Sequence, residues 1–289
     1  MKVIIIGIGL IGGSFAKDIR RLYPGTLIYG MDVNPAHLEE AKTLGLIDHI
    51  AGKEELPEAD MLLLSIPVDA LVEELPAVLD MVKDDAVVMD AGSTKSLVCR
   101  AVEDHPKRRN FLACHPIAGT EFSGPSAALE GLYEGKTNII CEVEKTAFKL
   151  QERALDFFNG LGMRIRYMNP EAHDKHIAYV SHLSHISSFM LGKTVIEKEK
   201  NERDIFDMAG SGFESTVRLA KSSPAMWTPI FRQNKDNVLE ILREYIQNLE
   251  EFRDKLNNDD FEGIYKEMDN TNKIREILRG IPQNKKVEK

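Results

Sequence analysis

Cysteine is scarce in this sequence, and its placement argues against two classes of site. The 289-residue chain contains three cysteines, Cys99, Cys114 and Cys141. Their odd number, without the close spacing of zinc ligands or of a redox pair, argues against a disulfide framework and a thiolate metal centre. Two of the three lie in apolar runs, so we expect reduced, buried thiols. Reduced thiols favour the cytoplasm as the compartment.

The sequence also lacks long apolar runs and an excess of positive charge. One lysine and a short apolar run precede Gly7, too little for the core of a signal peptide. No run approaches the roughly 18 apolar residues that indicate a membrane-spanning helix. The formal net charge of -9 argues against a nucleic-acid partner and against an anionic membrane. An anionic substrate would therefore need cations placed locally at its site.

The remaining composition is that of an ordinary globular protein. Apolar residues make up 43% of the chain and charged residues 29%. A chain of this length can form two domains, each with its own core.

A glycine-rich turn follows the first apolar run. Val3 to Ile6 is a β-branched run that predicts a strand, and residues 13–19 have the apolar spacing of a helix. The turn between them reads Gly7-Ile8-Gly9-Leu10-Ile11-Gly12. The first glycine permits a tight turn, the second lets the backbone approach a pyrophosphate, and the third lets the helix pack on the strand. This pattern predicts a dinucleotide site with the phosphates at the helix N-terminus.

Asp32 ends the second predicted strand, Thr26 to Met31, and lies twenty residues after Gly12. A carboxylate at this place can accept hydrogen bonds from the adenosine ribose hydroxyls and repels a 2'-phosphate. No Arg or Lys stands between Asp32 and Lys42 to bind such a phosphate, so we expect NAD rather than NADP. Capping of the helix that starts near Asn34-Pro35 is an alternative role for Asp32, compatible with ribose binding.

Further buried runs predict the rest of a sheet. These runs are Met61 to Ser65, Ala86 to Met89, Phe111 to Cys114, Thr137 to Cys141 and Met163 to Tyr167. Their repeated alternation with helical segments predicts a parallel, doubly wound sheet. Pro67 breaks the first run into a loop after Ser65, and we expect this loop to border a ribose of the cofactor.

Polar residues follow two of these strands at the edge where open α/β sheets bind their ligands. Ser93 lies after the run that ends at Met89, where its hydroxyl is a natural N-cap for the next helix and would also point into the cofactor crevice. His115 begins a polar, glycine-containing loop that extends to Gly124. A lone histidine at a strand end is more often structural than catalytic, so its role depends on the rest of the chain.

Only helices are predicted after Tyr167. Asn169-Pro170 has the pattern of a helix start, so we divide the chain into a cofactor domain, 1–168, and an all-helical domain, 169–289. The first helix carries two His-x-x-His pairs, formed by His173, His176, His182 and His185. Because no cysteine or catalytic glutamate accompanies them, we expect no metal. His182 and His185 share nearly one helix face, and the sequence leaves open which of them faces a cleft.

Two further features belong to the helical part. Arg218 lies between Val217 and Leu219 near a glycine-rich turn, where it could hold a carboxylate bidentately or lie exposed on a helix. From Val238 to Leu256 apolar residues recur at a spacing of three and four. One helix this long exceeds what the domain needs for its own core, so we expect a homodimer formed through the C-terminal helices. Residues 283–289 are expected to form a polar tail.

Taken in order, these motifs resemble the prephenate dehydrogenase family from Met1 to about Arg279. The elements that carry the resemblance are Gly7 to Gly12, Asp90-x-Gly-Ser-x-Lys95, His115-Pro-Ile-Ala-Gly-Thr-Glu121 with Ser123-Gly124, His173-Asp174, Ser181-His-Leu-x-His185, and Gly212-Phe213 followed by Arg218. The resemblance implies a Rossmann-like domain followed by an all-α dimerisation domain. It also implies NAD-dependent oxidative decarboxylation of prephenate to 4-hydroxyphenylpyruvate in tyrosine biosynthesis.

The resemblance also implies roles for individual residues. His115 would be the general base that takes the proton of the ring hydroxyl, and Ser93 would orient His115 and that hydroxyl. Arg218 would bind the side-chain carboxylate, His185 would lie at the substrate ring, and Glu121 would order or gate the site.

The chain departs from the family pattern at Ser184, where proline is frequent, at Ser215, where aspartate is frequent, and after Lys95, where glycine is frequent. The serine at 215 affects how Arg218 would be positioned. Three alternatives stay open at this stage. These are an arogenate dehydrogenase, a short-chain β-hydroxyacid dehydrogenase, which the His115 loop fits poorly, and an NAD-sensing protein without turnover.

Overall fold

The computed structural model describes residues 1–200, 202 and 204–279. The chain forms two compact units, Met1–Lys235 and Asp236–Lys289. The first unit extends past the boundary that we expect near residue 168, which stays a prediction. The polar tail expected at 283–289 lies outside the described residues.

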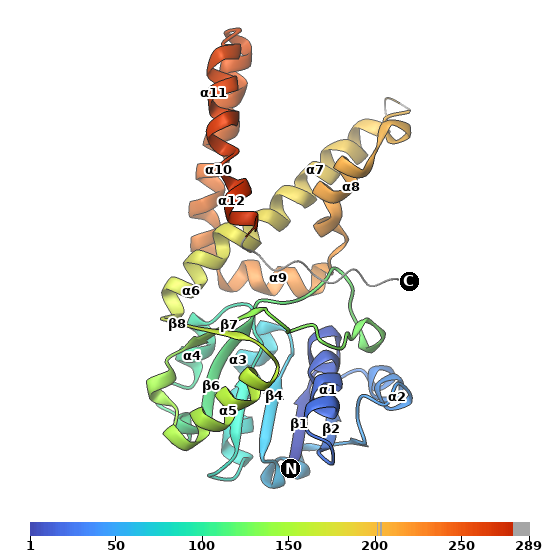
Figure 1. Cartoon of the computed structure of the whole chain (residues 1–289), viewed down its shortest axis with the longest axis vertical. Coiled ribbons are helices and arrows are strands. Elements are labelled where there is room, and N and C mark those ends of the chain that lie inside the picture. The colour runs from blue at the N-terminus through green and yellow to red at the C-terminus, as the bar shows by residue number, and fades with distance from the viewer. Residues whose placement is uncertain (201, 203, 280–289) are drawn as a thin grey trace. The chain divides into compact units, whose positions relative to one another are not determined.

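An eight-stranded sheet forms the centre of the first unit, with the strand order β3-β2-β1-β4-β5-β6-β7-β8 (Figure 1). The strands are β1 (Lys2–Ile6), β2 (Leu27–Met31), β3 (His49–Ile50), β4 (Met61–Leu64), β5 (Val87–Asp90), β6 (Phe111–Pro116), β7 (Thr137–Cys141) and β8 (Arg164–Met168). Each pair from β3 to β6 is parallel, which confirms the doubly wound arrangement. The carboxyl ends of β1, β4, β5 and β6 therefore share one edge of the sheet.

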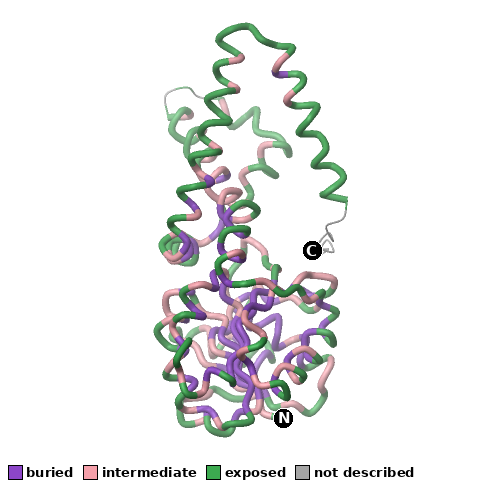
Figure 2. Tube along the Cα trace, turned by 90° about the vertical axis from the view of Figure 1, so that its left-hand side faces the viewer, coloured by how far each residue is buried: buried purple, intermediate pink, exposed green. Residues whose placement is uncertain are grey.

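Helices cover both faces of this sheet, which explains why its central strands carry apolar residues without alternation. The helices are α1 (Leu10–Leu22), α2 (Pro35–Thr43), α3 (Val68–Met81), α4 (Ser96–Ala101) and α5 (Phe148–Gly160). All residues of β4 and β5 are buried, and two apolar clusters, one for each face, enclose them. Figure 2 shows this burial as a purple band that follows the strands.

Two details of the sheet differ from the sequence prediction. β7 runs antiparallel to β6, because the segment between them contains only a 3-10 turn, Pro125–Ala127, and no α-helix long enough for a parallel crossover. β3 was not predicted, since its two residues are exposed and lack an apolar run. β8 then pairs parallel to β7, with α5 as the crossover.

The rest of the first unit is helical. Its helices are α6 (Pro170–Ile177), α7 (Leu183–Glu199), α8 (Ser211–Val217) and α9 (Pro224–Gln233). A π-helical turn, Ala178–His182, joins α6 to α7, so the single helix predicted to carry the four histidines is interrupted. Asn169 caps α6 through Ala172 N at 2.7 Å, as the sequence predicts.

Helix α9 lies across the carboxyl edge of the sheet (Figure 1). The side chain of Gln233 holds it there by pairing with Thr94 Oγ1 at 2.7 Å and with Asp69 Oδ1 at 2.9 Å. Arg232 adds an ion pair with Asp69 at 2.6 Å. The helical segment therefore closes the edge at which the sequence places the ligand.

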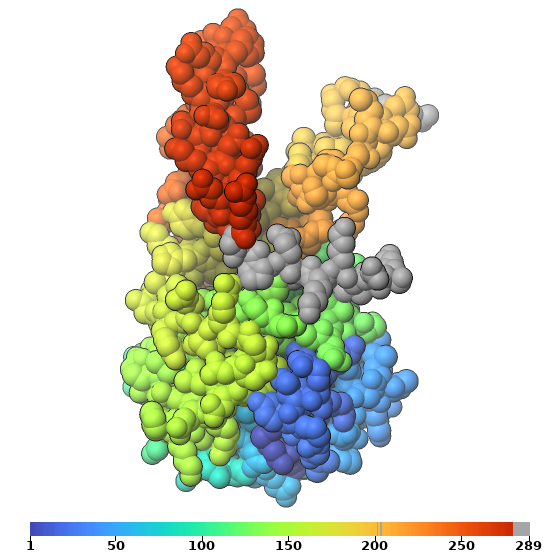
Figure 3. Space-filling view, viewed as in Figure 1, coloured from blue at the N-terminus to red at the C-terminus, as the bar shows by residue number. Residues whose placement is uncertain are grey.

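The second unit is a helical hairpin. It contains α10 (Lys235–Asn257), α11 (Phe261–Thr271) and α12 (Ile274–Arg279), and an ion pair between Lys255 and Glu267 joins α10 to α11. The long helix expected over 238–256 is confirmed. Large apolar side chains stay exposed on these helices, whose surface is orange and red in Figure 3, including Leu249, Tyr265 and Ile277.

None of the described helices combines the length and the apolar character that crossing a membrane requires.

Candidate active site

The glycine turn after β1 leads into the N-terminus of α1. Gly7 has a φ of +91°, a conformation that favours glycine, and a Cβ at Gly12 would lie 2.1 Å from Gly7 O and 2.5 Å from Ser65 Oγ. Helix α1 begins at Leu10, directly after its N-cap Gly9, which has no side chain to cap the first N–H groups. A Cβ at Gly9 would meet nothing within 4 Å. The open space at Gly9 and the uncapped helix N-terminus fit a bound pyrophosphate.

Asp32 is fixed beside this turn. Its Oδ2 accepts a hydrogen bond from Ile8 N at 3.0 Å, and its Oδ1 accepts one from Asn34 N at 2.9 Å. The alternative role as a cap for α2 is wrong, because the Asn34 side chain caps that helix through Ala36 N at 3.0 Å. The remaining lone pairs of the Asp32 carboxylate fit hydroxyl donors such as those of a ribose.

Ser65 and Pro67 lie at the carboxyl end of β4. The Ser65 hydroxyl donates to Gly7 O at 2.7 Å and so ties β4 to the glycine turn. Pro67 is exposed and directly precedes α3. Ser65 therefore shapes the turn, whereas direct contact of either residue with a cofactor stays a prediction.

The segment after β5 is organised by a buried ion pair between Asp90 and Lys95, both fully buried. Asp90 also accepts from Cys114 N at 2.9 Å, which joins β5 to β6. Burial lowers the pKa of the Lys95 amine, but the attraction and the hydrogen bond of Asp90 reverse this effect and raise the pKa overall. Lys95 is thus a charged structural residue, and its partner fixes the backbone next to His115.

Ser93 is not the N-cap that we predict from the sequence. Helix α4 begins at Ser96, too far along the chain for Ser93 to cap it, and the first N–H groups are capped by Asp174 from α6. The Asp174 carboxylate accepts from Lys95 N at 2.7 Å and from Ser96 N at 2.9 Å. Among the described residues no hydrogen bond joins Ser93 to His115, and its orienting role stays a prediction.

His115 lies inside β6 rather than after it, is 9% exposed, and contacts a second histidine. His115 Nδ1 lies 2.8 Å from His173 Nε2, and His173 Nδ1 lies 2.8 Å from Asp174 Oδ1. The sequence motif places His173 next to Asp174 but does not show that both reach His115. A buried His-Asp pair on one turn of α6 was the signal that could have identified them.

These groups have shifted acidities. Burial, and then the neighbouring His173, Lys95 and His182, hold the pKa of His115 well below its ordinary value, so the ring is neutral. Burial also lowers the pKa of His173, although Asp174 opposes this shift. Burial raises the pKa of the Asp174 carboxyl, but the hydrogen bonds from His173, Ser96 and Lys95 outweigh it and lower the pKa overall. The chain of groups is therefore a carboxylate followed by two neutral imidazoles.

The structure separates the roles of His182 and His185. His182 is fully buried, contacts Asn234 Nδ2 at 3.2 Å through Nδ1, and has a pKa that burial lowers to about 4. His185 is partly exposed, stacks on Trp227 with ring centroids 3.5 Å apart, and its Nδ1 lies 2.9 Å from Ser181 O. Of the two rings, His185 is thus the more exposed, and its place at the substrate ring stays a prediction.

Two buried polar atoms next to His185 lack a partner among the described residues. These atoms are His182 Nε2 and Trp227 Nε1. Trp227 has no role predicted from the sequence, because a single tryptophan on a helix has no distinctive spacing. An unpaired donor and an unpaired ring nitrogen, both buried, fit a polar partner such as water or a ligand atom.

Arg218 and Glu121 meet although they are far apart in the sequence. Arg218 Nη1 donates to Glu121 Oε2 at 2.8 Å, with the arginine side chain 48% exposed and the glutamate 13% exposed. Glu121 comes from the loop after His115, and Arg218 from the segment after α8. The pair shows that the Arg218 guanidinium reaches a carboxylate at the His115 loop.

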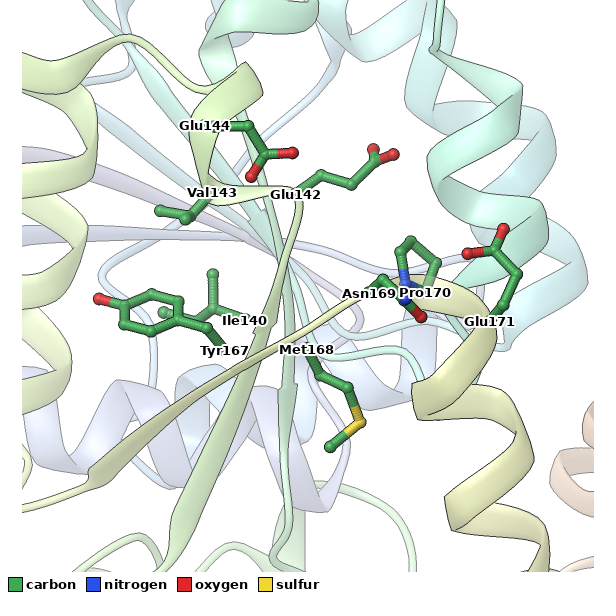
Figure 4. A pocket seen from close by; sticks show the side chains of 9 residues that line it. All are labelled: Ile140, Glu142, Val143, Glu144, Tyr167, Met168, Asn169, Pro170 and Glu171. Carbon is green, nitrogen blue, oxygen red and sulfur yellow. The ribbon is translucent and has the colours of Figure 1, made fainter.

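The cavity in Figure 4 does not coincide with these residues. Its volume is about 400 Å³, and it lies beside β7 and β8. Its lining residues are Ile140, Glu142, Val143, Glu144, Tyr167, Met168, Asn169, Pro170 and Glu171. None of the site residues predicted from the sequence lines it.

Within the described part of the chain, no group of three or more His, Cys, Asp or Glu side chains is arranged to hold a metal ion. All three cysteines are free and buried, as the sequence predicts.

Known proteins resemble this chain over nearly all of its length. Residues 15–167 match the family model "Prephenate dehydrogenase, nucleotide-binding domain", and residues 169–270 match "Prephenate dehydrogenase, dimerization domain". The prephenate dehydrogenase of Bacillus subtilis is 31% identical over 98% of this chain and 77% of its own length. The cyclohexadienyl dehydrogenase of Zymomonas mobilis is 29% identical over 96% of both.

Solved structures agree with this comparison. Prephenate dehydrogenase from Aquifex aeolicus, in complex with hydroxyphenyl propionate and NAD+, is 33% identical and superposes with a TM-score of 0.85 over 96% of this chain and 98% of that one. Synechocystis arogenate dehydrogenase is 26% identical, with a TM-score of 0.75 over 96% and 100%.

Proposed function

Because this chain belongs to the prephenate dehydrogenase family, we propose that it catalyses the NAD-dependent oxidative decarboxylation of prephenate to 4-hydroxyphenylpyruvate. One observation carries the proposal. A buried, neutral imidazole, His115, lies at the carboxyl edge of the sheet that also holds the glycine turn, and a hydrogen-bonded partner fixes its orientation.

His115 acts as the general base in this proposal. Loss of a hydride from the carbon that bears the ring hydroxyl leaves a positive centre unless the hydroxyl proton is removed at the same time. A neutral imidazole can accept that proton, and the lowered pKa of His115 keeps it in the basic form. The base needs no metal, because loss of the ring carboxylate yields an aromatic ring and makes the reaction strongly favourable.

Arg218 anchors the side-chain carboxylate of the substrate. Its guanidinium already holds the Glu121 carboxylate at 2.8 Å, so its geometry suits a carboxylate partner. Because Glu121 is paired with Arg218, it has to share or release the guanidinium when the substrate carboxylate binds. His185, stacked on Trp227, supplies a flat surface for the substrate ring.

The proposed cofactor is NAD, which the similar Aquifex aeolicus structure contains. Bound NAD supplies the hydride acceptor. In this chain the uncapped N-terminus of α1 and the glycine turn would bind the pyrophosphate, and Asp32 would bind the adenosine ribose. Asp32 also disfavours a 2'-phosphate by repulsion, which favours NAD over NADP.

The subunits are proposed to form a homodimer through the C-terminal helices. Residues 169–270 match a domain that the family model describes as a dimerization domain. The exposed apolar side chains of α10 to α12 are suited to burial against a second copy.

Arogenate is the alternative substrate, since relatives of similar identity include an arogenate dehydrogenase and a cyclohexadienyl dehydrogenase. Arogenate bears an amino group where prephenate bears the side-chain keto oxygen. Prephenate is proposed first because two of the similar proteins at 31% and 33% identity are prephenate dehydrogenases.

The test is to follow NADH formation with prephenate and with arogenate side by side. We expect a higher kcat/KM for prephenate. A higher value for arogenate would reverse the substrate assignment, and no NADH from either substrate, with NAD binding retained, would favour an NAD-sensing protein.

A further inference from the structure

We propose that Asp174 and His173 act as positioning residues that fix His115 in a single tautomer, with the proton on Nδ1 and the lone pair on Nε2. The inference rests on the proposed function, because it assigns the base to a particular atom of His115. Two buried contacts carry it, Asp174 Oδ1 to His173 Nδ1 and His173 Nε2 to His115 Nδ1, each 2.8 Å long.

The Asp174 carboxylate fixes where the protons of the two histidines lie. The Asp174 carboxylate accepts hydrogen bonds from Lys95 N at 2.7 Å and Ser96 N at 2.9 Å, in addition to its contact with His173. All three neighbours meet oxygen atoms of an ionised carboxylate, which can only accept. His173 Nδ1 must therefore carry a proton and donate it to Asp174.

The next steps follow in the same way. A neutral imidazole has one donor and one acceptor nitrogen, so a proton on His173 Nδ1 leaves His173 Nε2 as an acceptor. His115 Nδ1 lies 2.8 Å from that acceptor and must be its donor. The neutral His115 ring then has its lone pair on Nε2, the nitrogen on the far side of the ring from His173.

Asp174 and His173 can also stabilise the proton that His115 takes up. When His115 Nε2 accepts the hydroxyl proton, the ring becomes a cation in a buried position next to Lys95 and His182, which disfavour it. The hydrogen bond from Nδ1 through His173 connects this cation to the Asp174 carboxylate, a negative charge held by the backbone of α4. After the reaction the proton leaves His115 Nε2 for water.

Asp174 also joins α6 to neighbouring segments of the fold. Its carboxylate caps α4 by accepting from the N–H of Lys95, which precedes the helix, and from that of Ser96, which begins it, and its backbone oxygen accepts from Asn234 Nδ2 at 2.6 Å. Asn234 in turn contacts His182. The segments that meet at the site are therefore held in register by one buried polar network.

Substitutions at His173 distinguish a role in orienting His115 from a role in packing alone. In His173→Asn the amide can still donate to Asp174 but is too short to reach His115. In His173→Gln the amide oxygen can reach the position of Nε2 and accept from His115. His176→Asn is the matched control, since His176 lies on the same helix and is exposed.

We expect His173→Asn to lower kcat about tenfold to a hundredfold, less than the roughly ten-thousandfold cost of a wrong tautomer in the serine-protease triad, where the catalytic histidine contacts the carboxylate directly. KM for prephenate and the Kd for NAD should change less than about twofold, because the variant touches no binding group. His173→Gln should recover most of kcat, and His176→Asn should match the unaltered protein. Equal kcat in the Asn and unaltered proteins would overturn the proposal.

A second measurement does not depend on turnover. Imidazole ¹⁵N chemical shifts of the labelled protein report which nitrogen of each histidine bears the proton, with the His115 signals assigned by their loss in His115→Asn. We expect a protonated Nδ1 and an unprotonated Nε2 for His115 in the unaltered protein. A protonated Nε2 on neutral His115 would refute the proposed tautomer. Absence of activity with the predicted shifts intact would instead refute the proposed function alone.

Discussion

Replacing Arg218 with alanine should raise KM for prephenate while leaving kcat nearly unchanged. The magnitude follows from the free energy of one charged hydrogen bond and its conversion into affinity. A hydrogen bond to a charged group contributes about 1.5 to 3 kcal/mol, and each 1.4 kcal/mol is about a tenfold change in affinity. We therefore expect KM to rise about tenfold to a hundredfold, and the 48% exposure of the Arg218 side chain favours the lower end of that rise.

Glu121 complicates this prediction and supplies its control. In Arg218→Ala the Glu121 carboxylate loses its ion pair and repels the incoming substrate, so part of the rise in KM comes from Glu121. Adding Glu121→Gln to Arg218→Ala removes that repulsion and should recover part of the lost affinity. Glu121→Gln alone frees Arg218 from a partly exposed ion pair worth up to about 1 kcal/mol, which should lower KM by up to about fivefold.

The assay is the initial rate of NADH formation at saturating NAD over a range of prephenate concentrations for all four proteins. Thermal unfolding of each variant checks that the fold is retained. A KM for Arg218→Ala within twofold of the unaltered value would refute the anchoring role. A rise in KM for Glu121→Gln would instead show that Glu121 helps to bind the substrate.

Three further predictions concern other groups. His115→Asn keeps a donor for His173 but lacks the basic nitrogen, so kcat should fall about a hundredfold to ten-thousandfold with the Kd for NAD nearly unchanged; near-normal turnover would exclude His115 as the base. Asp32→Ser removes the charge beside the glycine turn and should relax the preference for NAD, measured as the ratio of kcat/KM with NAD and NADP; equal use of both by the unaltered protein would contradict the ribose role. The pKa of His182 is about 4 in the folded chain and 6.5 in its unperturbed state, so the unfolded chain binds the proton more tightly. The contribution of His182 to the free energy of unfolding should therefore be fully present above pH 6.5 and fall as the pH drops toward 4. At pH 5 the loss should be up to about 2 kcal/mol. Urea unfolding above pH 6.5 and at pH 5 measures this difference. The His182→Gln variant should lose less free energy of unfolding between the two conditions.

Local patterns predicted the elements that line the cofactor part of the site. The run before Gly7, the glycines and Asp32 are close in sequence, and their geometry depends on strand, turn and helix rules that act over a few residues. Burial of both sheet faces could likewise be predicted, because strands such as Met61–Leu64 carry apolar residues without alternation. The antiparallel direction of β7 could not, since it depends on what the chain does between residues 117 and 136 rather than on the strand itself.

The contacts between distant segments needed the structure. Ser93 has the sequence of an N-cap, but Asp174, about eighty residues later, caps α4 instead, because α6 packs against that end of the helix. His182 and His185 have the same local pattern, and only the packing around each ring shows that His182 is buried while His185 stacks on Trp227. Periodicity places a side chain on a face of a helix but does not show which neighbour covers that face.

The sequence by itself determined that this chain has a glycine-rich turn after its first strand, an aspartate at the end of the second strand, and a histidine at the carboxyl edge of the sheet, from which we predict the NAD site and the base. Each of these depends on residue type and short-range spacing. Only the tertiary structure decided that His115 contacts His173 and Asp174, and that Arg218 reaches Glu121. Hydrogen bonds and ion pairs between segments 58 and 97 residues apart depend on how the helices pack over the sheet, which no local pattern specifies.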